Sequence, residues 1–190
     1  MIRIGILGDI GSGKSFVAKQ FKSPVFNADA VIIKIYKNNK KCFYKLKKTL
    51  PKYIKSFPIK KKELRRSILS NNKNLKKISK VVHPIVRAEM RKFFVYNKKK
   101  KIVILDIPLL IENKLNEKTD ILVYVDAKEK DIKKRLKKRK GYNEKLINNF
   151  KKKQYSLTKK KKLSDYVIKN NFKTNTIKQK VEMIKKKVLI

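Results

Sequence analysis

Glycine is scarce in this chain, and its placement is the first informative feature of the sequence. The 190 residues include only 5 glycines, and four of them are Gly5, Gly8, Gly11 and Gly13 near the amino terminus. Glycine adopts positive φ angles without strain, so a sequence poor in glycine keeps it where the backbone needs that freedom. We therefore expect a tightly turned loop at residues 8–13.

Cysteine and long apolar runs are also scarce, and each shortage excludes a class of protein. The single cysteine, Cys42, cannot form an internal disulfide, so we expect a cytoplasmic protein with Cys42 as a small core residue. The longest apolar run, Ile102 to Ile111, contains Asp106 and Pro108. Since this run is shorter than the about 20 residues of a transmembrane helix, no membrane partner is expected.

Acidic residues are few, which leaves a net charge of +41 from 55 Lys+Arg against 14 Asp+Glu. Such a charge ordinarily indicates a nucleic acid or an anionic membrane as partner. Here the lysines are spread through every segment, which is typical of a general compositional bias. We expect no specific nucleic-acid partner, but a positive field that attracts polyanionic substrates.

The segment Gly8–Ser15 matches the phosphate-binding loop pattern G-x-x-x-x-G-K-[ST]. An apolar run, Ile4 to Leu7, precedes it, and a helix-like segment, Ser15 to Phe21, follows. In such a loop, backbone N–H groups turn inward around an anion and the helix N-terminus adds partial positive charge. Lys14 then reaches the β and γ phosphates and the Ser15 hydroxyl holds Mg²⁺, so the pattern predicts a nucleoside triphosphate site.

Short apolar segments bounded by turn residues predict a parallel sheet within one α/β domain that spans residues 1–190. The expected strands are Ile2–Leu7, Val25–Phe26, Ile102–Leu105, Ile121–Val125 and Tyr166–Ile168. A stripe of apolar residues indicates a closing helix, and it consists of Ile177, Val181, Ile184 and Val188.

Two further helical segments are predicted outside the strands and the closing helix. Residues 30–97 have helical apolar spacing throughout, and we interpret them as an inserted subdomain that covers the substrate. Residues 140–163 are very basic and helical from Tyr142 to Leu163, which fits a lid that closes over ATP phosphates. Gly141 falls where the preceding helix, Asp131 to Lys140, would end.

Two aspartates follow predicted strands and are candidates for chemistry. Asp29 follows the second strand, where ligands of a doubly wound sheet bind, and we expect it beside the phosphate loop. There it suits a group that accepts a proton from an attacking hydroxyl or orients that hydroxyl toward phosphorus. It can also cap a helix from Ala30 to Tyr36, and the chemical and capping roles are compatible. Asp106 ends the third strand, where a P-loop enzyme commonly carries a carboxylate near Mg²⁺.

The single histidine, His83, is followed by Pro84, which disfavours helical geometry at His83 and can start a new helix. We therefore expect a helix break at this pair. A histidine there can hydrogen-bond a substrate, or serve a capping or core role. Arg87 and Arg91 share one face of the following helix and can bind a phosphate, or form part of the solvated surface.

The absence of particular motifs narrows the class of P-loop protein. Regulatory GTPases need a D-x-x-G segment, and this chain has no glycine between Gly13 and Gly141. Motor and DNA-acting ATPases need coupling elements for which the chain has little room. A small phosphotransferase with a substrate cap and a lid remains.

The sequence resembles the dephospho-CoA kinase family over nearly its whole length. The motifs that carry the resemblance, in family order and spacing, are Ile10–Ser15, Ala28–Asp29, Val82–Val86, Asp106–Glu112 and Ser164–Asn170. The resemblance implies a P-loop kinase fold with a five-stranded parallel sheet flanked by helices, a helical CoA-binding insertion and a helical lid. It also implies transfer of the ATP γ-phosphate to the ribose 3′-hydroxyl of dephospho-CoA, with Mg²⁺ as cofactor. We expect a monomer or a weak homo-oligomer.

The resemblance further implies roles for individual residues. Asp29 matches the catalytic aspartate and also binds the acceptor, as do His83, Arg87, Pro108 and Leu109. Ser15 and Asp106 would hold the metal, directly or through water. The residues expected to contact ATP are Gly8, Gly11, Ser12, Gly13, Lys14, Ser15, Phe16, Arg135 and Arg139.

Three positions depart from the family pattern. Asp9 stands where a second glycine is usual, and its carboxylate would weaken ATP binding unless it points to solvent. Asn27 stands where an aspartate is common, and Phe16 replaces a threonine. Two rival functions are another small-molecule kinase, of nucleoside or shikimate type, and a basic ATPase that depends on nucleic acid.

Overall fold

The computed structural model describes residues 1–138 and 142–189, and over these residues the chain forms a five-stranded, all-parallel sheet of order β2-β3-β1-β4-β5. The strands are β1 (Ile2–Gly8), β2 (Val25–Asn27), β3 (Ile102–Asp106), β4 (Ile121–Asp126) and β5 (Tyr166–Lys169). Each predicted strand is present and begins where the sequence pattern placed it. The α/β class and the parallel sheet are therefore confirmed.

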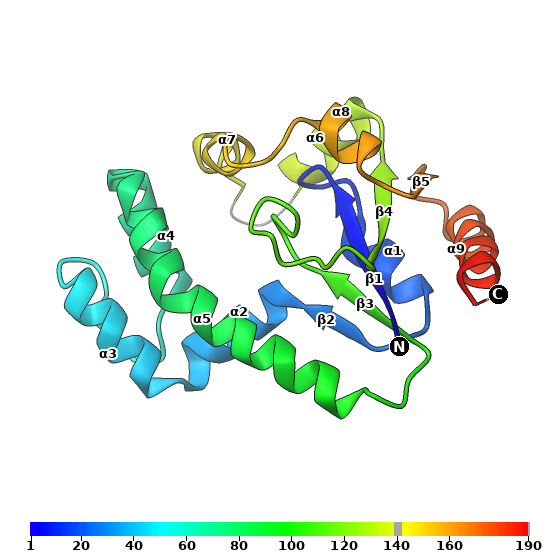
Figure 1. The fold of residues 1–190 in the computed structure, drawn as a ribbon. Helices are drawn as coiled ribbons and strands as arrows, with labels where there is room; N and C mark the ends of the chain where they lie inside the picture. Colours follow the sequence, from blue (N-terminus) through cyan, green and yellow to red (C-terminus); the bar gives the residue numbers. More distant parts are fainter. Residues whose placement is uncertain (139–141, 190) are drawn as a thin grey trace. The chain divides into compact units, whose positions relative to one another are not determined.

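Strand β1 lies at the centre of the sheet, between β3 and β4 (Figure 1). Ile2 pairs with Ile102 on one side, and Ile4 pairs with Ile121 on the other. A strand with neighbours on both edges and helices on both faces is shielded from water, which is why β1 and β3 read as almost continuous apolar runs. The loop that follows β1 thus starts from the central strand of the sheet.

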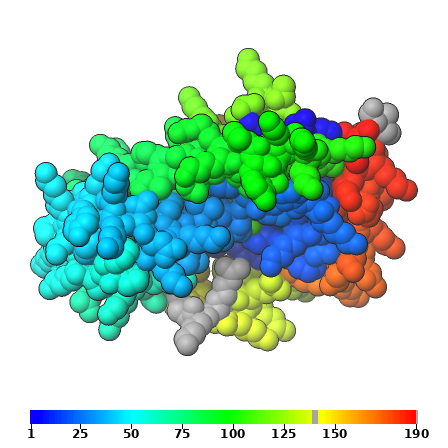
Figure 2. All heavy atoms as spheres, turned by 90° about the horizontal axis from the view of Figure 1, so that it is seen from below, coloured from blue at the N-terminus to red at the C-terminus, as the bar shows by residue number. Residues whose placement is uncertain are grey.

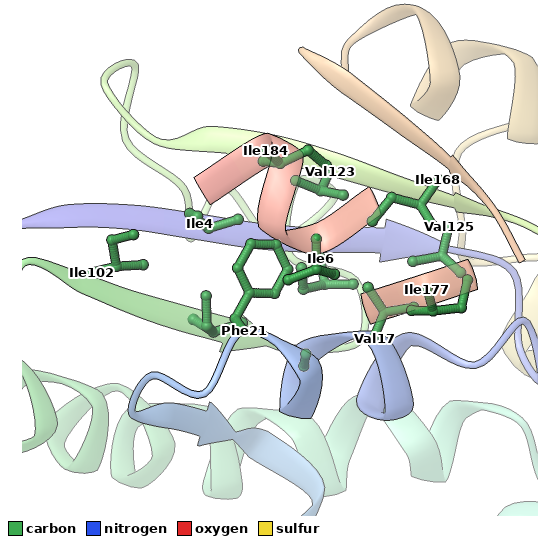
Figure 3. Close-up of a cluster of buried hydrophobic side chains, with 13 residues drawn as sticks. Ile4, Ile6, Val17, Phe21, Ile102, Val123, Val125, Ile168, Ile177 and Ile184 are labelled. Carbon is green, nitrogen blue, oxygen red and sulfur yellow. The ribbon is translucent and has the colours of Figure 1, made fainter. Parts of the chain in front are cut away.

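Five helices accompany the sheet in the described residues: α1 (Lys14–Gln20), α6 (Glu129–Lys137), α7 (Glu144–Lys151), α8 (Leu157–Lys162) and α9 (Thr174–Val188). Figure 3 shows Val17 of α1 and Phe21, the C-cap of α1, directed into the same cluster as Ile4 and Ile6 of β1. Ile177 of α9 joins them, and all five side chains are fully buried. Each such side chain contributes about 1.5–3 kcal/mol of transfer free energy, so this cluster fixes α1 beneath β1.

The predicted single helical segment from Tyr142 to Leu163 is two helices instead, α7 and α8. The break has a local cause, because the Ser156 side chain accepts a hydrogen bond from the backbone N–H of Lys159 (3.2 Å) and so begins a new helix. Asn143 caps α7 in the same way through the N–H of Leu146 (2.8 Å). The expected helix end at Gly141 lies outside the described residues.

The described chain divides into two compact units, Met1–Asn27 with Asn97–Ile190, and Ala28–Tyr96. The second unit contains α2 (Ala28–Asn38), α3 (Lys40–Thr49), α4 (Lys61–Ser70) and α5 (Lys73–Tyr96). Helix α5 packs against the other three, and Figure 2 shows side chains of α2 and α3 directly beside those of α5. Helix α2 begins at Ala28 rather than Ala30, so Asp29 lies in its first turn instead of capping it.

The expected helix break at His83 and Pro84 is wrong, because α5 runs without interruption from Lys73 to Tyr96 with Pro84 inside it. Pro84 removes one backbone hydrogen bond to Lys80 and crowds its carbonyl, which by itself disfavours the helix. Burial of an apolar stripe outweighs this local penalty. The stripe faces the neighbouring helices and consists of Ile78, Val82 and Val86.

Among the described residues, no helix combines the length and the apolar character that crossing a bilayer requires.

Candidate nucleotide site

The loop after β1 has the backbone shape that its glycines predict. Gly8, Gly11 and Gly13 have φ angles of 144°, 90° and 94°. A Cβ atom on Gly13 would lie 2.4 Å from Nδ2 of Asn170, and one on Gly8 would lie 2.7 Å from the carbonyl oxygen of Val125. Both conformation and space therefore require glycine here, and the predicted tight turn is confirmed.

Asn170, just beyond β5, holds this loop in place. Its Nδ2 donates to the carbonyl oxygen of Ser12 (2.7 Å), and its Oδ1 accepts from the N–H of Phe172 (2.8 Å). Its own N–H donates to the carbonyl of Asp126 (2.6 Å). The side chain is buried, so one asparagine ties the end of β4 and the end of β5 to the phosphate loop. The sequence placed Asn170 in a family motif but assigned it no role.

Lys14 starts α1, and its ammonium folds back over the loop. The Nζ atom donates to the carbonyl oxygens of Gly8 (3.2 Å) and Asp9 (2.8 Å). These contacts hold the positive charge against the backbone of residues 8 and 9 of the loop. Ser15 beside it is exposed, whereas Phe16 is half-buried and packs against the core of the sheet. A Ser15 hydroxyl open to solvent is accessible to a hydrated metal ion.

The Asp9 carboxylate is directed into the protein rather than to solvent. Asp9 is only 6% exposed. Its Oδ1 accepts a hydrogen bond from the N–H of Ile10 (2.6 Å), and its Oδ2 forms an ion pair with the ammonium of Lys151 (3.2 Å). Burial raises the pKa of the nearby Tyr124, and the negative charges of Asp126 and Asp9 add to that increase. The family departure at position 9 therefore places a paired carboxylate within the loop itself.

Asp106 ends β3 beside Asn27 of β2, as the register of the two strands dictates. Asp106 is buried, and its Oδ2 accepts from Nδ2 of Asn27 (2.5 Å). No cluster of three acidic, histidine or cysteine side chains suited to a metal occurs in the described part of the chain.

Pro108 and Leu109 lie beside the phosphate loop, because the turn after β3 returns towards it. Together with Gly8 and Lys14 they line a shallow pocket that is open to solvent. Leu109 has a φ of 59°, an uncommon conformation for a residue with a side chain. The structure thus brings two predicted acceptor-binding residues next to two predicted ATP-binding residues.

Of the two arginines predicted to contact ATP, the structure describes only Arg135. Arg135 is exposed on α6, and its guanidinium lies 4.2 Å from the ring centroid of Phe172, whose backbone N–H is held by Asn170. Such a contact restricts a long side chain at the edge of the loop. Arg139 lies outside the described residues.

Asp29, His83 and Arg87 belong to the second unit. His83 is half-buried and Arg87 is exposed one turn further along α5. Burial lowers the pKa of His83 below its ordinary value, and the charge of Arg87 lowers it further. His83 is therefore suited to donate or accept a hydrogen bond as a neutral imidazole. The expected approach of these side chains to the phosphate loop stays a prediction.

A glycine-lined loop that joins the central strand of a parallel sheet to a helix, with a lysine folded over it, defines a P-loop nucleotide-binding protein. Comparison with known proteins narrows the class further. A family model described as dephospho-CoA kinase matches residues 2–176. A curated dephospho-CoA kinase from Wolbachia pipientis wMel is 35% identical over 170 residues, which cover 87% of each chain. The chain therefore belongs to the dephospho-CoA kinase family.

Solved structures agree with the fold. TT1252 from Thermus thermophilus has a TM-score of 0.78 and 26% identity, with 98% of this chain and 97% of that chain covered. A dephospho-CoA kinase from Campylobacter jejuni has a TM-score of 0.63 and 20% identity, with 98% and 96% covered. At that identity the second likeness concerns the fold alone.

Proposed function

We propose that this chain transfers the γ-phosphate of ATP to the ribose 3′-hydroxyl of dephospho-CoA, giving coenzyme A and ADP. The observation that carries the proposal is the family match over residues 2–176, which includes the phosphate loop whose glycines adopt the conformation that phosphate binding requires. Residues 30–97 would bind the acceptor, and residues 140–163 would act as the lid.

The reaction needs a base at the acceptor hydroxyl and a cation at the transferred phosphoryl group. The 3′-oxygen attacks the γ-phosphorus while its proton passes to the Asp29 carboxylate, and the bond to the β-phosphate oxygen breaks to release ADP. Lys14 would offset charge on the transferred group. Ser15 and Asp106 would hold Mg²⁺, which neutralises the β and γ phosphates when bound. His83 and Arg87 would bind the acceptor, and Pro108 and Leu109 would line its path.

A coupled ADP-release assay with dephospho-CoA tests the proposal. Parallel reactions contain nucleosides, shikimate, or DNA and RNA at physiological salt. We expect ADP release with dephospho-CoA alone. Phosphorylation of a nucleoside or shikimate without activity on dephospho-CoA would favour another small-molecule kinase, and strong stimulation by nucleic acid would favour an ATPase.

Two variants test the assigned roles. Asp29→Asn should lower kcat far more than it weakens ATP binding, since the carboxylate acts on the acceptor hydroxyl. Lys14→Ala should reduce turnover by about 100-fold or more, because a cation that stabilises the transferred group is lost. Glu182→Gln, on the exposed surface of α9, is a control that should keep full activity. Unchanged turnover in Asp29→Asn would leave that residue with only a role in the first turn of α2. A cytoplasmic location and a monomeric or weakly associated state stay predictions.

A further inference from the structure

Two lysines line the pocket beside the phosphate loop, and only one has been assigned a role. Lys14 enters it from the start of α1, and Lys160 enters it from α8. Helix α8 packs against β1, which carries the loop. Glu112 and Gln154 line the same pocket. A second ammonium group therefore stands at the place where the phosphates of a nucleotide are expected.

Lys160 is set apart by its burial. Among the residues that the structure describes, Lys160 is the one buried lysine, with 3% of its surface exposed. The other lysines of α8 are exposed, namely Lys159, Lys161 and Lys162. Moving an ammonium group out of water is unfavourable unless partners compensate it. In a chain where lysine occupies so many solvated positions, a buried lysine needs a specific explanation.

The compensation comes from two side chains. The Lys160 ammonium lies 3.1 Å from Oε1 of Glu112, whose side chain is 7% exposed, and donates to Oε1 of Gln154 at 2.7 Å. Glu112 is fixed in turn, because the same Oε1 accepts from the backbone N–H of Tyr155 (3.0 Å). The turn after β3 and the connection between α7 and α8 thus hold Lys160 in one position.

An ammonium group has three N–H donors, and these partners accept two of them. Within residues 1–138 and 142–189, no third acceptor contacts Lys160. Its remaining donor is available to a ligand in the pocket that it lines. The ligand oxygen that best suits such a donor is anionic, and phosphoryl oxygens are what the neighbouring loop and Lys14 are built to receive.

We propose that Lys160 donates a hydrogen bond to a phosphoryl oxygen of bound substrate, and that Glu112 and Gln154 are positioning residues for its ammonium group. The proposal rests on the proposed function and adds a second cation to its site. A fixed cation needs no rearrangement when charge develops on the transferred phosphoryl group, and this is the condition under which electrostatic stabilisation is largest. The oxygen belongs either to the γ-phosphate of ATP or to the diphosphate of the acceptor.

The test compares Lys160→Met with Lys178→Met, at an exposed lysine on α9 outside the proposed lid. Since Lys160→Met alone leaves the Glu112 carboxylate buried without its partner, the double variant Lys160→Met/Glu112→Gln is included to protect the fold. The melting temperature checks that each variant is folded. The readouts are kcat, the KM values for ATP and dephospho-CoA, and the Kd of inorganic tripolyphosphate measured by calorimetry.

We expect both Lys160 variants to lose turnover by about 100-fold, while Lys178→Met retains it. A lower kcat with weaker tripolyphosphate binding assigns the contact to the phosphates of ATP, and a raised KM for dephospho-CoA alone assigns it to the acceptor diphosphate. A folded double variant with wild-type kcat, KM values and tripolyphosphate affinity overturns the proposal. If the wild-type chain does not phosphorylate dephospho-CoA, the proposed function fails, but a Lys160-dependent loss of tripolyphosphate binding still supports the phosphate contact.

Discussion

The carboxylate of Asp9 lies 3.2 Å from the ammonium of Lys151, so the phosphate loop is joined to α7 by an ion pair. Asp9 adds a negative charge next to the site expected for ATP phosphates, and Lys151 partly neutralises it. We predict that Asp9→Gly lowers the Kd for ATP by about 3–10-fold, as expected for loss of about 1 kcal/mol of repulsion. Calorimetric titration with ATP at two salt concentrations measures this effect.

Lys151→Met should have the opposite effect and raise the Kd for ATP, because the Asp9 charge is then unpaired. Lys152→Met, the next residue and also exposed, is the control and should change the Kd little. Weaker ATP binding in Asp9→Gly would instead mean that the carboxylate supports the loop through its bond to the N–H of Ile10.

Asn170→Ala should reduce both stability and ATP affinity. The substitution leaves the Ser12 carbonyl and the Phe172 N–H without their side-chain partner, and each buried polar group left unsatisfied costs about 1–3 kcal/mol. Urea denaturation and ATP titration measure the two losses. Asn171→Ala, at the exposed neighbouring residue, should lower both the stability and the ATP affinity less. Equal losses in the two variants would contradict a bracing role for Asn170.

The imidazole of His83 should titrate below its ordinary pKa of 6.5, because burial and the Arg87 charge disfavour protonation. Since His83 is the single histidine, its Hε1 signal in a proton NMR titration reports this pKa directly. Arg87→Gln should raise the midpoint, and Arg91→Gln, one turn further, should move it less. A midpoint above 6.5 in the wild-type chain would contradict the assigned environment.

The same shift has a consequence for stability. Below pH 6.5 the unfolded chain takes up a proton at His83 before the folded chain does, so the free energy of unfolding falls as the pH drops. Well above pH 6.5 both forms are neutral and this contribution is constant. His83→Gln should remove this part of the pH dependence in urea denaturation series between pH 7 and pH 5.

Pro84→Ala should stabilise the fold. Alanine restores the hydrogen bond to the Lys80 carbonyl and removes the ring clash inside α5, for an intrinsic gain of up to about 3 kcal/mol in the free energy of unfolding. Thermal denaturation measures the change, and Pro51→Ala, in the turn after α3, is the control without such a gain. Lower stability in Pro84→Ala would show that the ring packs favourably where it stands.

The sequence predicted the sheet and the phosphate loop well, because strands such as Ile102–Asp106 and glycines such as Gly13 respond to local rules. It failed at Pro84, where packing along α5 outweighs the local preference of the His-Pro pair. It also missed the separation of α7 from α8, for which Ser156 was the available signal.

The pairs Asp9–Lys151 and Glu112–Lys160 were beyond sequence reasoning for another reason. With lysine at so many positions, nothing local distinguishes the buried Lys160 from exposed neighbours on α8. The partners lie 142 and 48 residues apart in the chain, and only the folded sheet brings them together.

The hydrogen bond between Asn170 and Ser12 joins two residues that are translated far apart in time. The turn at residues 8–13 is translated before Asn170, which follows the last strand of the sheet. A nascent chain whose translation has not reached Asn170 therefore lacks this brace of the phosphate loop, and ATP binding that depends on the brace can stabilise only chains extended beyond that residue.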